Sequence, residues 1–318
     1  MRPQTLGMNL LASDPSSIQT PERLEVAATV VLLRDGAHGL ETFLMRRALQ
    51  ASVLGGVHVF PGGKLDASDV LSVHRLDCNA DALRAALGEP ELSAQLAAAI
   101  HVAALRELFE EAGVLLANGP DGPWQPSGQG ASSALGAVPP ARDVPFEAML
   151  DALRLNLSSS LIAPWSRWIT PVIPGMPRRR FDTRFFVARM PAGQIADVAD
   201  HESTIGRWLG AREALEMYWQ RDIELAPPQI VTLAHLSRHA SADAAFDAAR
   251  ARLPRLIHPV AIEVDAARAF CYPGDAAHGD RERAFPGVSR LVLREGRFEP
   301  LDGFEAFFTD SPGAFEDR

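Results

Sequence analysis

The sequence is poor in cysteine and contains no long apolar run. Only two cysteines, Cys78 and Cys271, occur in 318 residues, so a disulfide framework is excluded, and their spacing fits no zinc-binding motif. This low content favours a reducing compartment. The longest apolar runs, such as residues 26–33, are the length of a strand and too short to cross a membrane.

Basic residues are also in deficit, with 31 Lys and Arg against 40 Asp and Glu and a net charge of −9. No broad basic surface for a nucleic-acid backbone is therefore expected. Residues 1–17 lack the basic start and apolar stretch of a signal peptide, and the final FEDR is no peroxisomal address. We expect a soluble, cytoplasmic protein without nucleic-acid or membrane partners, and the sequence leaves a homodimer open.

The length and the 47% hydrophobic content allow a large buried core. Residues 1–22 form a polar lead-in, residues 23–250 read as one domain, and residues 251–318 have the short strands and Pro/Gly turns of a β-rich appendage. Residues 118–143 are rich in Gly, Pro and Ser, which predicts a flexible surface loop.

Hydrophobic periodicity predicts the order of helices and strands. Residues 25–47 predict a hairpin with a turn at 36–39, followed at 55–65 by a glycine-rich loop or a broken strand edge. Helical patterns occupy 81–87, 91–113, 145–155, 211–222 and, as one helix, 227–252, and strand-like patterns occupy 114–117, 167–173, 178–190 and 204–210.

The stretch RELFEEAGV at 106–114 is the most informative one. Glu107, Glu110 and Glu111 share one helix face, opposite an apolar stripe of Leu105, Leu108, Phe109 and Ala112. A solvated polar face explains this pattern, but like charges at i and i+4 repel unless a cation compensates. Clustered carboxylates also suit Mg²⁺ or Mn²⁺. From the residues alone, both interpretations stay open.

The same stretch resembles the second half of the Nudix box, the signature of the Nudix hydrolases. Arg106, Glu107, Glu110 and Glu111 fall in register, together with Leu108, Gly113 and Val114. Gly63 and Asp69 resemble the first half of the box, with aspartate in place of the usual glutamate. Gly63 and Arg106 are 43 positions apart rather than fourteen, which implies an insertion of 29 residues. Such an insertion resembles the branch of peroxisomal coenzyme A diphosphatases of the motif-nineteen type.

The resemblance implies an α/β fold, the Nudix α/β/α sandwich with a mixed β-sheet, here with an inserted helical segment at about 70–100 and a small C-terminal appendage. It implies hydrolysis of a diphosphate linkage in a nucleoside diphosphate derivative, with Mg²⁺ or Mn²⁺ bound by Glu107, Glu110 and Glu111. Glu107 would bind metal or activate water, Arg106 would orient a glutamate, and Gly63 would let the loop backbone approach the metal. The insertion is expected at the mouth of the site.

Residues 43–63 are similar to a coenzyme A-associated signature that precedes the box in some Nudix enzymes. Arg47, Ala48 and Gly56 fall in register, as do Leu44 and the run Phe60-Pro61-Gly62-Gly63. Ser52 replaces the second arginine of that signature. Arg46 or the cluster Arg178–Arg179–Arg180 could compensate, although such arginines also occur in solvated turns. This similarity implies coenzyme A or an acyl ester as substrate, with contacts from Arg46, Arg47, Phe60, Gly62 and Gly63.

Three questions stay open at this stage. Glu202 is a candidate general base, because the superfamily often recruits a loop glutamate, but an exposed strand-edge glutamate explains it equally well. The leaving group could instead be that of ADP-ribose or NADH. A third hypothesis is that the domain is catalytically silent and only binds a nucleotide. The intact set of three glutamates argues against it.

Overall fold

The computed structural model describes residues 24–50, 54–126, 144–173, 180–198 and 203–309. Its centre is an eight-stranded sheet in which the strands run β10-β2-β1-β9-β8-β11, with β3 paired to β2 and β4 paired to β1. Strands β1 and β9 are parallel, as are β8 and β11, and the other pairs are antiparallel. The sheet is therefore mixed, as the sequence predicted. Its strands are β1 (Leu24–Gly36), β2 (Gly39–Arg47), β3 (His58–Val59), β4 (Gly62–Lys64), β8 (Ile162–Ile169), β9 (Arg180–Arg189), β10 (Ser203–Gly210) and β11 (Arg255–Ile257).

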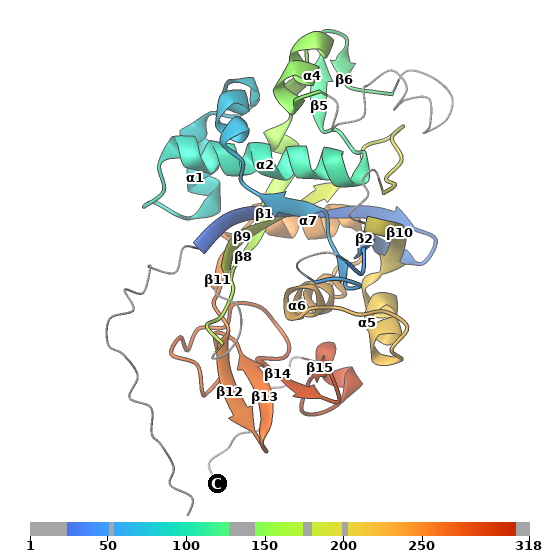
Figure 1. Cartoon of the computed structure of the whole chain (residues 1–318), viewed down its shortest axis with the longest axis vertical. Helices are drawn as coiled ribbons and strands as arrows, with labels where there is room; N and C mark the ends of the chain where they lie inside the picture. The colour runs from blue at the N-terminus through green and yellow to red at the C-terminus, as the bar shows by residue number, and fades with distance from the viewer. Residues whose placement is uncertain (1–23, 51–53, 127–143, 174–179, 199–202, 310–318) are drawn as a thin grey trace, which may run out of the picture.

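Both faces of this sheet are covered. Along β1, Val30 and Leu32 face one apolar cluster, whereas Val31 and Leu33 face the other, as the alternation of a strand requires. The first cluster contains α2 (Ala94–Ala112), and the second contains α5 (Ala211–Trp219), α6 (Pro227–Leu236) and α7 (Ala242–Arg250). Figure 1 shows α2 above the sheet and α5 and α6 below it, and α7 packs against β8 and β9. The arrangement is a three-layer sandwich.

Smaller elements flank these layers. Between β4 and α2 lie η1 (Ala67–Arg75) and α1 (Ala80–Leu87), both packed against α2. A three-stranded sheet joins β6 (Gly122–Pro123), β5 (Ala117–Gly119) and β7 (Asn156–Leu157), with α4 (Phe146–Leu153) and η2 (Ser159–Leu161) beside it in the chain. The C-terminal part forms the sheet β12 (Val260–Val264), β13 (Ala267–Cys271), β14 (Arg290–Arg294) and β15 (Arg297–Glu299), followed by η3 (Phe304–Phe307).

The C-terminal sheet is attached to the main layers through α5. Tyr218 of α5 donates its hydroxyl to the Phe298 carbonyl at 3.0 Å and accepts from the Phe298 N–H at 2.8 Å. Trp219 packs against Phe304 and Phe307 of η3. The division at residue 250 remains a prediction, and β11, which follows it, is a strand of the main sheet.

Three predictions of local structure are wrong. The loop predicted at 118–143 contains β6 and part of β5, and its residues 127–143 lie outside the described part of the chain. Residues 114–116 are buried but form no strand, and β5 begins only at Ala117. Residues 227–252 form two helices instead of one. Ser241 starts α7 by accepting a bond from the Ala244 N–H, and Asp35 accepts one from the Ala242 N–H. These caps reorient the chain after α6 without glycine or proline.

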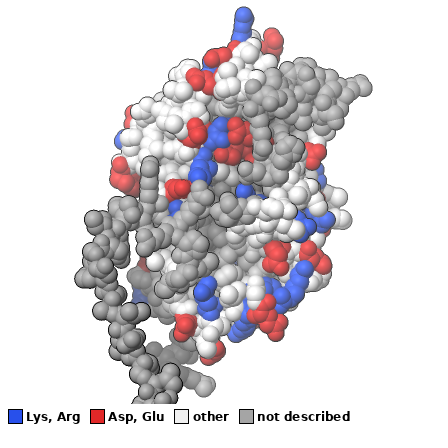
Figure 2. Space-filling view, in the orientation of Figure 1, with Lys and Arg blue, Asp and Glu red and all other residues white. Residues whose placement is uncertain are grey.

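The described residues also bear on membrane contact and surface charge. None of the described helices is both long and apolar enough to span a bilayer. On the face shown in Figure 2, the Lys and Arg of the described part are interleaved with Asp and Glu.

Candidate active site

Helix α2 carries the acidic motif near its C-terminus. The helix begins after Ser93, whose hydroxyl accepts a hydrogen bond from the Leu96 N–H. It ends at Gly113, which adopts a left-handed conformation with φ of 68°, the usual role of glycine after a helix. The predicted apolar stripe is buried, with Leu105, Leu108 and Ala112 fully inaccessible.

The opposite face of α2 is not simply solvated. Arg106 and Glu111 are only 8% and 6% exposed, because the loop from β4 through η1 covers this side of the helix. The Glu110 side chain keeps 30% of its exposure and that of Glu107 keeps 13%. The three glutamates thus lie at the edge of a partly covered site. On a freely hydrated helix face they would be exposed.

All five N–H donors of the Arg106 guanidinium find acceptors. Nε donates to Asp69 Oδ1 at 2.7 Å, and Nη2 donates to Asp69 Oδ2 at 3.1 Å and to the Lys64 carbonyl at 3.0 Å. Nη1 donates to Glu107 Oε1 and to Glu110 Oε2, both at 2.8 Å. Because the guanidinium is a rigid planar fork, this arrangement fixes Arg106 and, with it, two of the three glutamates.

Asp69 is the buried anchor of Arg106. It is 1% exposed, and its Oδ2 also accepts from the Asp66 N–H at 2.8 Å in a capping box that starts η1. The sequence matched this position only to the first half of the box, with aspartate in place of the usual glutamate. In the structure Asp69 joins η1 to the acidic helix.

The Gly62–Gly63 loop closes over the glutamates. The Gly62 N–H donates to Glu111 Oε2 at 2.7 Å. A Cβ on Gly63 would lie 2.2 Å from Glu107 Oε1, and a Cβ on Gly62 would lie 2.6 Å from the Ala28 carbonyl oxygen. Two adjacent glycines therefore allow β4 to pair with β1 while its backbone touches two carboxylates.

The site carries more negative than positive charge. Burial, together with the charges of Glu110 and Asp69, raises the pKa of Glu107 to about 7, although Arg106 acts in the opposite direction. Burial alone would lower the pKa of Arg106, but the hydrogen bonds that it donates to Asp69 and the charges of Glu107, Asp69 and Glu110 raise it. Such a carboxylate cluster is stabilised by an added cation.

The donor set fits a hard divalent cation. Glu107 and Glu110 each place an oxygen 2.8 Å from the same Arg106 nitrogen, so they are close enough to share one ion. Oxygen donors of this kind suit Mg²⁺ and Mn²⁺. In the described part of the chain, no three acidic, His or Cys side chains surround a common cation position.

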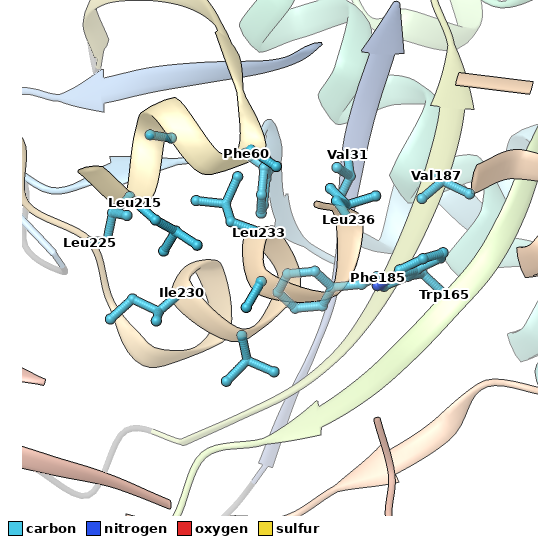
Figure 3. Close-up of a cluster of buried hydrophobic side chains, with 14 of the residues drawn as sticks. Val31, Phe60, Trp165, Phe185, Val187, Leu215, Leu225, Ile230, Leu233 and Leu236 are labelled. Atoms are coloured by element: carbon cyan, nitrogen blue, oxygen red, sulfur yellow. The ribbon is translucent and has the colours of Figure 1, made fainter. Parts of the chain in front are cut away.

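The predicted substrate residues occupy three different environments. Arg47, at the end of β2, lies 4.0 Å from Glu111 through Nη1 and Oε1, at the acidic site itself. Arg46 points to the opposite face of β2, beside its cross-strand partner His58. Burial and the charges of Arg46 and Arg207 lower the pKa of His58 to about 4. Phe60 is 2% exposed and packs edge-on against Phe185 in the core (Figure 3), so its ring anchors the loop and offers no face to a ligand.

Several predicted residues lie outside the described part of the chain. Glu202, Ser52, Arg178 and Arg179 belong to this group. Arg180, the last of the three arginines, is described and donates Nε to the Thr170 carbonyl at 2.8 Å. A role for Glu202 as general base stays a prediction.

The helical part of the insertion does not lie at the mouth of the site. Helix α1 packs against α2 and β8, at the end of α2 away from Gly113 (Figure 1). Seventeen residues of helix separate Ala94 from Glu111, which is roughly 25 Å at 1.5 Å per residue. Glu89, after α1, is buried between Arg184 and Arg167 at 2.5 and 2.7 Å. The acidic site is instead contacted by η1, through Asp69.

Sequence reasoning missed Gln194, which holds the segment after α2. Its Oε1 accepts from the Leu115 N–H and its Nε2 donates to the Leu115 carbonyl, both at 2.9 Å. Beside it, the Asp197 N–H donates to the Ala112 carbonyl at the end of α2. No local pattern marks Gln194, because its partner is 79 positions away.

Comparisons with known proteins agree with this geometry. The sequence profile of the NUDT19 Nudix domain matches residues 19–236. Acyl-coenzyme A diphosphatase NUDT19 of Xenopus laevis is 28% identical over 240 residues, covering 63% of this chain and 60% of that protein. The Homo sapiens protein of the same name is 30% identical over 242 residues, covering 64% and 62%. The chain thus matches about three fifths of the length of these relatives.

Solved structures extend the likeness to three dimensions. A NUDIX hydrolase from Alicyclobacillus acidocaldarius is 25% identical and aligns with a TM-score of 0.55, covering 74% of this chain and 99% of that one. The fold class predicted from the sequence is confirmed. The match at residues 19–236 spans both halves of the interrupted box, and the chain therefore belongs to the NUDT19 Nudix domain family of Nudix hydrolases.

Proposed function

We propose that this protein hydrolyses the diphosphate linkage of coenzyme A or an acyl-coenzyme A, giving 3′,5′-ADP and 4′-phosphopantetheine or its acyl derivative. The observation that carries the proposal is the cluster of Glu107, Glu110 and Glu111, ordered by Arg106 and closed by the Gly62–Gly63 loop. Two relatives named as acyl-coenzyme A diphosphatases support the choice of substrate.

The residues of the site have different roles in this proposal. Glu107, Glu110 and Glu111 hold Mg²⁺ or Mn²⁺, which neutralises the diphosphate and lowers the pKa of the attacking water when bound. Arg106 keeps two of these carboxylates in place, and the Gly62 N–H keeps the third. Arg47 provides a positive charge at the same edge for a phosphate oxygen.

The reaction adds water across one P–O–P linkage. The water oxygen forms a bond to one phosphorus, the bridging oxygen leaves with the other phosphate, and the protons of water are shared between the two products and solvent. Each product carries a phosphomonoester. No redox partner is needed, and a cytoplasmic location is part of the same proposal.

The test is a turnover assay with a matched variant pair. Purified protein is incubated with Mg²⁺ or Mn²⁺ and with coenzyme A, an acyl-coenzyme A, NADH and ADP-ribose, and products are separated by chromatography. We expect 3′,5′-ADP from coenzyme A substrates. The double variant Glu110→Gln/Glu111→Gln should lose at least a thousandfold in kcat, and Glu263→Gln, an exposed glutamate of β12, should retain activity. Faster turnover of NADH or ADP-ribose would change the substrate, and no turnover by wild type would remove the enzymatic proposal.

A further inference from the structure

A group of basic side chains surrounds Trp165 of β8. The His235 ring lies 4.5 Å from the Trp165 ring and the His239 ring lies 5.8 Å from it, measured between centroids. The guanidinium carbon of Arg252 lies 4.9 Å from the same ring. His235 and His239 are 5.9 Å apart. Three side chains therefore lie around one indole: His235 at the end of α6, His239 in the α6–α7 connection and Arg252 after α7.

This group contains three basic side chains and, among the described residues, no carboxylate. Among the described residues, neither imidazole and no nitrogen of Arg252 has a hydrogen bond or ion pair with a protein acceptor. The charged groups that act on His235, His239 and Arg252 are arginines and histidines, including Arg238 and Arg255. By contrast, Arg212, which also lies over an aromatic ring, is paired with Glu305.

Holding these groups together has a cost. Burial and the charges of Arg252, His239 and Arg238 lower the pKa of His235 to about 3. Burial and neighbouring cations also lower the pKa values of His239 and Arg252. All three side chains keep partial solvent access, so a small anion can reach them. A bound oxyanion would accept hydrogen bonds from these donors and would favour the protonated forms that burial and the neighbouring cations disfavour.

We propose that His235, His239 and Arg252 around Trp165 form a binding site for a phosphate-class oxyanion, either free phosphate or the phosphomonoester of a nucleotide. Guanidinium and imidazole N–H groups are strong donors to phosphate oxygens. Trp165 is 2% exposed and serves as the wall that orients the donors. Its apolar cluster lies on the α6–α7 face of the sheet, whereas α2 lies on the other face, so this site is separate from the glutamates.

The proposal is tested by NMR on protein labelled at histidine. Inorganic phosphate is titrated at pH 7 against chloride of equal ionic strength, and ring resonances are assigned with His235→Gln and His239→Gln. We expect saturable shifts of both rings, with a dissociation constant in the millimolar range. Arg252→Gln should weaken binding at least tenfold, and Arg221→Gln, an exposed arginine paired with Glu295, should change it less than twofold.

The arms of the titration distinguish the source of the anion. Equal affinity for phosphate and AMP assigns the site to the phosphate group alone, and at least tenfold tighter binding of AMP assigns it to a nucleotide. If Arg252→Gln fails to fold, as judged by thermal unfolding, His239→Gln provides the same loss. Shifts that chloride reproduces, or binding that both variants retain, would overturn the proposal.

Discussion

Arg106 and Asp69 form a two-bond ion pair, with Nε to Oδ1 at 2.7 Å and Nη2 to Oδ2 at 3.1 Å, that joins the acidic helix to the segment inserted before it. Both side chains are almost inaccessible, at 10% and 0% exposure. The pair has a consequence for activity, because the same guanidinium also holds Glu107 and Glu110.

The first prediction follows from that pair. Asp69→Asn removes the charge and leaves Arg106 buried with fewer acceptors, so it should lower the free energy of unfolding by about 3 kcal/mol. Activity should fall further than stability explains, because Glu107 and Glu110 lose their common anchor. Urea unfolding and kcat at saturating Mg²⁺ measure the two effects. Asp81→Asn, in an exposed pair with Arg84, is the control, and equal effects of the two substitutions would contradict the prediction.

The second prediction separates the two glycines of the loop. Gly62→Ala places a Cβ 2.6 Å from the Ala28 carbonyl oxygen and should destabilise the fold by about 2 kcal/mol, since backbone cannot yield easily. Gly63→Ala meets the end of the Glu107 side chain, which can move. It should therefore reduce Mg²⁺ affinity, measured by calorimetry, more than stability.

Gly279→Ala is the control for both glycines, because no described residue other than its chain neighbours has an atom within 4 Å of the added Cβ. A Gly63→Ala variant with unchanged metal affinity would show that the loop does not constrain Glu107.

The sequence predicted the face shared by the three glutamates because helical spacing is a local property. It also predicted Gly113 as the end of the helix and the buried Leu105 and Leu108. It did not predict that Arg106 is buried, because burial depends on how the 37 positions between Asp69 and Arg106 fold back over α2. The predicted strand at 114–117 failed for a related reason.

That segment shows why apolar runs mislead. Val114, Leu115 and Leu116 are buried, as in a strand, but the Leu115 N–H and carbonyl are satisfied by a side-chain amide from Gln194 and not by a neighbouring strand. The position of α1 was missed similarly, because the buried Glu89–Arg184 pair joins residues 95 positions apart.

The third prediction concerns Gln194. Gln194→Leu leaves the Leu115 N–H and carbonyl without partners in a buried position, which should cost about 2–4 kcal/mol of unfolding free energy. Gln194→Glu keeps the acceptor but loses the donor and places a buried carboxylate beside the Leu115 carbonyl oxygen, so it should also lower the unfolding free energy. Urea unfolding compares both with Gln220→Ala, an exposed glutamine after α5. If Gln194→Leu is as stable as that control, the clamp contributes nothing.

The last prediction concerns pH and His101. The imidazole is 1% exposed, its Nδ1 lies 2.8 Å from the Ala97 carbonyl, and burial lowers its pKa from 6.5 to about 4. Between these values the unfolded chain binds a proton that the folded chain does not. The contribution of His101 to stability is therefore complete above pH 6.5 and is lost as the pH falls towards 4, by at most about 1.4 kcal/mol per pH unit.

His101→Leu removes the pH-dependent contribution of the imidazole, so the slope of unfolding free energy against pH between 6.5 and 4 should become flatter. Val102→Ala, also fully buried and beside it in α2, removes packing without removing a titrating group. It should lower stability by about 1–2 kcal/mol at every pH and leave the slope unchanged. Parallel curves for wild type and His101→Leu would mean that the folded protein binds a proton at His101 as readily as the unfolded chain does, against the burial that the structure shows.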